Sequence, residues 1–131
     1  MSEVDDLIAY AYAHDREGDE HGAIKFYDAA YRLGVPDEKR RRFLVGYGST
    51  LRNVGRSEEA VAILGQAIAD DPGYPAYVPF LALALADAGH PKAALATMLG
   101  AVLDVARPDA LDGFERALGE YHQELLDKAQ R

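Results

Sequence analysis

The segment from residue 41 to residue 72 carries apolar side chains at helical spacing on both sides of a glycine. Before Gly55, the side chains of Leu44, Tyr47 and Leu51 recur every three or four positions, which places them on one face of a helix. After Gly55 the same spacing returns in Ala60, Leu64 and Ala67, and Pro72 follows. The pattern predicts two amphipathic helices that are joined by a tight turn and face each other.

The same reasoning predicts about seven helices and no strands along the chain. Glycines and prolines mark the breaks, and we expect Ser2 or Asp5 to cap the first helix and Ser57 to cap the fourth. The fifth helix starts either near Pro79 or with an irregular first turn, because proline disrupts a helix interior. The expected ranges are about 3–17, 20–33, 37–54, 57–71, 79–88, 91–105 and 108–130.

Small residues recur in a constant register, which indicates an internal repeat. In each of three series the successive spacings are 37 and 34 residues. The series are Gly18, Gly55 and Gly89, then Ala23, Ala60 and Ala94, and then Ala30, Ala67 and Ala101. A period of this length predicts stacked helical hairpins, in which small side chains let neighbouring helices approach closely.

This arrangement resembles the tetratricopeptide-repeat family over about residues 4–106. The large–small pair Tyr47-Gly48 carries the resemblance, together with the alanine after the turn. The segments GSTLRNVGR and FLALALADAG look most like those of small bacterial repeat proteins. The resemblance implies an all-α, right-handed superhelix in a single domain over residues 1–131. Its three hairpins would span about residues 4–36, 41–72 and 75–106, with a C-terminal capping helix at about 108–130.

The resemblance also implies a concave groove, lined by the first helix of each hairpin, that binds a peptide or protein segment. This function is a protein–protein interaction scaffold rather than an enzyme, and an acidic ligand is favoured. The alternative is a self-associating module that forms a homodimer without a dedicated peptide ligand. The residues expected to face the groove are Ile8, Tyr12, Arg16, Arg42, Val45, Ser49, Arg52, Asn53, Leu83 and Asp87.

Charge is distributed unevenly along the chain. Residues 39–56 hold 6 bases and no acid, although the whole chain has a net charge of −8 and a pI of about 4.9. The overall charge argues against nucleic acid and anionic membranes as partners. The basic run is either an anion-binding strip or a solvated helix that pairs with neighbouring acids. Its members are Lys39, Arg40, Arg41, Arg42, Arg52 and Arg56.

Catalytic, metal-binding and cofactor motifs are not recognisable in the sequence. The chain has no cysteine, and a predicted turn separates His14 and Glu17 from His21, so a metal site on one helix face is not expected. Gly46-x-Gly48 lacks the third glycine and the preceding strand of a dinucleotide fingerprint. The acidic N-terminus and the lack of an apolar run of about 20 residues favour a cytoplasmic location.

The last predicted helix has an apolar stripe on one side. The stripe consists of Leu111, Phe114, Leu118, Tyr121 and Leu125. A stack of repeats exposes an apolar face at its end, so we expect this helix to cover the sixth helix. The expected contacts on the sixth helix are Leu95, Met98 and Val102.

Overall fold

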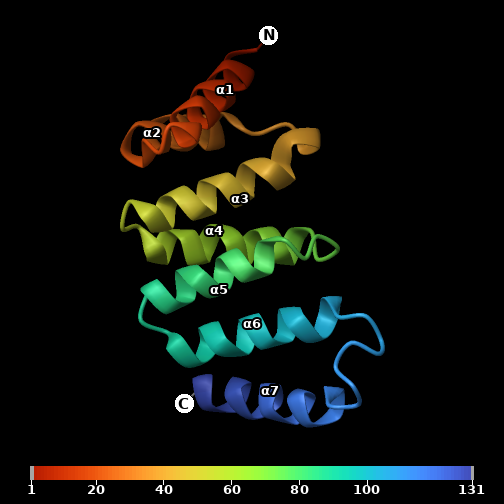
Figure 1. Ribbon diagram of the computed structural model, residues 1–131. Coiled ribbons are helices and arrows are strands. Elements are labelled where there is room, and N and C mark those ends of the chain that lie inside the picture. The colour runs from red at the N-terminus through yellow and green to blue at the C-terminus, as the bar shows by residue number, and fades with distance from the viewer. Residues whose placement is uncertain (1, 131) are drawn as a thin grey trace.

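The computed structural model describes residues 2–130, which form seven α-helices and no strand (Figure 1). The predicted all-α fold is therefore confirmed. The helices are α1 (Glu3–Arg16), α2 (Glu20–Leu33), α3 (Asp37–Asn53), α4 (Ser57–Asp70), α5 (Tyr77–Asp87), α6 (Pro91–Val105) and α7 (Glu115–Ala129). No helix within residues 2–130 combines the length and the apolar character needed to cross a membrane.

The helices follow one another in an extended stack, with α1 at one end and α7 at the other (Figure 1). Each helix packs against the next along the chain, and α3 also contacts α1 and α5. The first helices of successive hairpins are therefore neighbours, which is the arrangement that creates a continuous surface along them.

Close packing of small and large residues holds α3 against α4. Gly48, Ala60 and Leu64 are all buried, and Leu64 and Ala60 have no exposed surface. A Cβ atom at Gly48 would lie only 2.6 Å from Leu64 Cγ, so glycine is what allows this approach. The predicted face-to-face contact between the two halves of the segment is confirmed.

Most predicted helix ends agree with the structure, and one predicted cap is wrong. Ser2 caps α1, with its hydroxyl accepting a hydrogen bond from the Asp5 amide. Ser57, by contrast, is the first residue of α4, and Arg56 occupies the cap position without a side-chain cap. The Arg56 guanidinium instead binds Glu59 in the first turn, with 2.6 Å between Nη2 and Oε2.

The sequence pattern did not locate the first residues of two helices, and the structure does. Helix α5 begins at Tyr77, so Pro79 lies in its first turn, where a missing N–H leaves no hydrogen bond unmade. Helix α7 begins at Glu115 rather than at about residue 108. The backbone of Asp112 (φ 52°) and Gly113 (φ 86°) is left-handed, which ends any helix approaching from Pro108.

Helix α7 packs on α6 as expected, but only part of the predicted apolar stripes is covered. Met98 of α6 and Leu118 and Leu125 of α7 are half-buried. Leu95 and Val102 of α6 remain 57% and 43% exposed, so they are not the contact. Gly100 is the close approach, because a Cβ atom there would lie 2.9 Å from Nε2 of His122 on α7. Phe114 and Tyr121 of the predicted stripe are exposed.

Candidate functional site

Two adjoining cavities lie between α1 and α3, with volumes of about 580 and 550 Å³. They share Tyr12 of α1, Arg42 of α3 and Tyr74 of the connection between α4 and α5. We call the two cavities together the α1–α3 groove. Its further lining residues are Asp5, Ile8, Ala9, Asp15, Arg16, Tyr27, Glu38, Lys39, Arg41, Val45 and Gly46.

A partly buried hydrogen-bond network forms the base of the larger cavity. The Tyr27 hydroxyl donates to the Asp15 carboxylate, and the Thr50 hydroxyl donates to the same carboxylate over 3.2 Å. The network joins α1, α2 and α3. Asp15 keeps its negative charge, and these two hydroxyls take up part of its hydrogen-bonding capacity.

The hydroxyls of Tyr12 and Tyr27 remain protonated at neutral pH. Burial raises the pKa of Tyr12 above its ordinary value. Burial, followed by the hydrogen bond to Asp15, raises the pKa of Tyr27 much further. At Tyr12 and Tyr27 the groove therefore presents neutral aromatic rings, not phenolates that would repel an anion.

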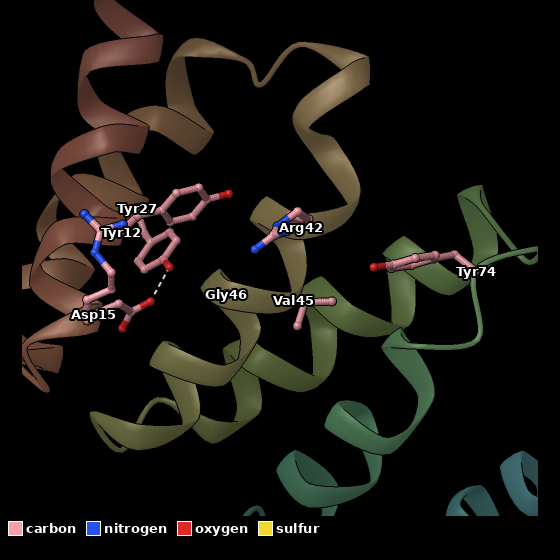
Figure 2. A pocket seen from close by; sticks show the side chains of 8 residues that line it. Tyr12, Asp15, Tyr27, Arg42, Val45, Gly46 and Tyr74 are labelled. Atoms are coloured by element: carbon pink, nitrogen blue, oxygen red, sulfur yellow. Dashed lines mark hydrogen bonds between the residues drawn. The ribbon is translucent and has the colours of Figure 1, made fainter.

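Gly46 lets Tyr27 lie directly beneath α3. A Cβ atom at this position would lie 2.5 Å from the Tyr27 hydroxyl oxygen. Val45 and Arg42 flank this position and face the cavity, as Figure 2 shows. The glycine read from the sequence as a helix-packing residue thus shapes the cavity as well.

Tyr74 forms the wall opposite Tyr12, and its ring packs against the guanidinium of Arg41, which is itself ion-paired. Arg41 Nε and Nη2 donate to the two Asp71 oxygens over 2.7 and 2.9 Å. The same guanidinium lies over the Tyr74 ring, 4.8 Å from its centroid. The rings of Tyr74 and Tyr77 also pack edge to face, with 4.8 Å between their centroids. A connecting segment that lacks secondary structure thereby becomes a defined surface.

Most of the basic run is neutralised by acids from neighbouring helices. Within residues 2–130 the pairs are Lys39–Asp5, Arg41–Asp71, Arg52–Asp87, Arg56–Asp28 and Arg56–Glu59. The Lys39 ammonium, through its hydrogen bond, holds the pKa of Asp5 below its ordinary value. These pairs explain most of the run as a set of links between helices.

Arg42 is the member of the basic run that lines both cavities and forms no ion pair with any residue between 2 and 130. Arg16 of α1, which lines the larger cavity, forms none with these residues either. Figure 2 shows the Arg42 guanidinium between Tyr12 and Tyr27 on one side and Tyr74 on the other. The Arg42 side chain is exposed. A cation is therefore available where two cavities meet.

The structure brings together half of the residues predicted to face the groove. Ile8, Tyr12, Arg16, Arg42 and Val45 line the cavities, whereas Ser49, Arg52, Asn53, Leu83 and Asp87 line neither. Arg52 Nε lies 2.7 Å from Asp87 Oδ2, in an ion pair without the geometry of a hydrogen bond. Two candidates of opposite charge thus neutralise each other.

Tyr74 lines both cavities and is one of the groove residues that the sequence pattern did not reveal. It lies between Gly73 and Pro75, outside any helix, where apolar periodicity carries no information. The one feature of the sequence that points to Tyr74 is an aromatic residue in a turn-forming segment, three positions before a second tyrosine, Tyr77.

The stack of helices and the groove along α1 and α3 together define a helical-repeat protein. A family model described as "Tetratrico peptide repeat" matches residues 6–125, which is most of the chain. The chain therefore belongs to the tetratricopeptide-repeat family, a family of non-enzymatic scaffolds that mediate protein–protein interactions. Searches of curated proteins and of solved structures returned no significant match.

Proposed function

We propose that this protein is an interaction scaffold that binds a segment of another protein in the α1–α3 groove. The favoured segment carries an acidic side chain next to an apolar one. The observation that carries the proposal is Arg42, a cation without an ion-pair partner among residues 2–130, flanked by tyrosine rings at the junction of two cavities.

The chemistry of the groove supports an acidic ligand. A guanidinium donates two parallel hydrogen bonds to a carboxylate, and such charge-assisted bonds are shorter and stronger than neutral ones. Tyr12 and Tyr74 offer flat apolar surfaces with little conformational freedom to lose. An acid beside an apolar anchor would satisfy both features at once.

The pairing of Arg52 with Asp87 moves the expected site towards the first two hairpins. An anion that approached Arg52 would have to displace a carboxylate at 2.7 Å. We therefore expect Arg42 to contribute more to binding than Arg52. Ser49, Asn53 and Leu83 would contribute only if the ligand extends along α3 towards the third hairpin.

Neither catalysis nor nucleic-acid binding is part of this proposal. The polar groups at the base of the groove bind one another, as Tyr27 and Thr50 do with Asp15. The net charge of −8 opposes a nucleic-acid partner. The second candidate function is self-association, which the exposure of Phe114 and Tyr121 on α7 favours.

The experiment begins with the purified chain as bait in the native cell extract, followed by titration calorimetry with the recovered partner. Arg42→Glu reverses the free groove charge and is expected to weaken binding by about tenfold or more. Arg107→Glu is the matched control, because it makes the same charge change at an exposed position outside the groove. Equal affinities of these two variants would contradict the proposed site.

A further inference from the structure

Helix α7 has an exposed aromatic face that no other helix covers. Within residues 2–130, α6 is the only helix that packs against it. Phe114, just before the helix, is 64% exposed, and Tyr121 is 58% exposed. They are seven positions apart, about two helical turns, so both project from the same side. Exposed aromatic residues in such an arrangement are typical of an interaction surface.

Acidic residues accompany this aromatic face. Glu124 lies one turn after Tyr121, and therefore next to it on the helix surface. The helix carries four acids and two bases: Glu115, Glu120, Glu124, Asp127, Arg116 and Lys128. Glu124 pairs with Lys128 over 3.0 Å, but both side chains are at least half exposed, so this pair is weak.

Helix α7 thus has the chemistry that the α1–α3 groove is suited to bind, namely an acid beside an aromatic ring. It cannot reach the groove of its own chain, because α1 and α7 lie at opposite ends of the stack (Figure 1). Helices α3 to α6 lie between them along the chain of packed neighbours. The occupant that fits is therefore α7 of a second copy.

We propose that α7 of one copy docks on the α1–α3 groove of another, with Tyr121 entering between Tyr12 and Tyr74. Glu124 then leaves Lys128 of its own helix and pairs with the guanidinium of Arg42 in the other copy. This inference rests on the proposed function, because it uses the same groove. Every copy offers one helix and one groove, so the contact is head-to-tail and produces chains or rings.

The test is the solution mass, measured by light scattering over a range of concentrations. The buffer should have about 0.15 M ionic strength, which screens the repulsion between two acidic chains beyond about 8 Å. The wild-type mass is expected to rise above 14.3 kDa with concentration. Tyr121→Glu removes the aromatic ring that docks, and Arg42→Glu reverses the charge that receives Glu124. Each variant alone is therefore expected to remain a monomer.

An equimolar mixture of the two variants is the decisive sample. One variant retains an intact α7 and the other retains an intact groove, so they are expected to form a one-to-one complex and nothing larger. Both side chains are exposed, and circular dichroism checks that both variants stay folded.

Three outcomes would overturn the proposal: a wild-type monomer at every concentration, a mixture that stays monomeric, or an Arg42→Glu variant that assembles like the wild type. The last outcome would indicate a symmetric contact through α7 alone. None of them affects the proposed function, which stands if the monomer still binds its partner through Arg42.

Discussion

Gly48 of α3 lies against Leu64 of α4 so closely that even a methyl group has no room between them. A Cβ atom at position 48 would meet three carbon atoms of the Leu64 side chain at 2.6 to 2.7 Å. Gly48→Ala is therefore expected to destabilise the protein by about 1–3 kcal/mol through overpacking. Urea unfolding measured by circular dichroism gives the free energy of unfolding directly.

Gly65 provides the matched control on α4. A Cβ atom built there meets no atom within 4 Å, and its backbone is helical. Gly65→Ala is expected to stabilise the protein by about 0.5–1 kcal/mol, because alanine loses less backbone entropy in a helix. If Gly48→Ala and Gly65→Ala changed the free energy of unfolding in the same direction and by the same amount, the packing described for α3 and α4 would be contradicted.

Asp28 links α2 to the second hairpin, and it makes the free energy of unfolding depend on pH in the acidic range. Burial opposes its ionisation, but hydrogen bonds from Arg56 and Tyr47 outweigh burial and lower the pKa of Asp28 in the folded state. A group with a lowered pKa in the folded state stabilises the protein at pH values above its unfolded-state pKa, which is about 3.9 for aspartate. This contribution is lost as pH decreases through the folded-state pKa.

Asp28→Asn should therefore cost about 1–2 kcal/mol at pH 7 and less at pH 2, because protonation of the wild-type carboxyl removes this contribution as pH decreases through its folded-state pKa. Urea unfolding of both proteins at the two pH values measures the difference. Asp70→Asn, on the exposed end of α4, is the control and should behave like the wild type at both. A cost of Asp28→Asn that is independent of pH would contradict the network.

Helix α7 covers the Gly100 side of α6, and its removal should be costly. Truncation after Arg107 would expose that side and leave the last hairpin without a cover. We expect aggregation or a clearly lower melting temperature, measured by light scattering and thermal circular dichroism. A truncated chain that is monomeric and equally stable would show that α7 contributes no cover.

The sequence predicted the stacked hairpins well, because small residues at constant spacing determine which helix faces meet. Ala60 is fully buried, as the spacing implied, and Gly34 ends α2 with a φ of 98°. These features are local, or repeat with the period of the chain, so periodicity alone detects them.

Features that depend on contacts between hairpins could not be predicted. Arg52 has the spacing of a groove residue, yet its charge is taken by Asp87 of the next hairpin. The close approach of Gly100 on α6 to His122 on α7 is a further contact that no periodicity reveals. Tyr74 reaches the groove because Arg41 holds it, and that contact requires the folded connection.

Site-specific photo-crosslinking tests the central claim most directly. A benzophenone side chain at Val45, inside the groove, is compared with one at Leu95, which is exposed on α6 and distant from the cavities. With the partner recovered from the native extract, position 45 is expected to crosslink and position 95 is not. Crosslinks from position 95 with none from position 45 would show that the partner binds elsewhere.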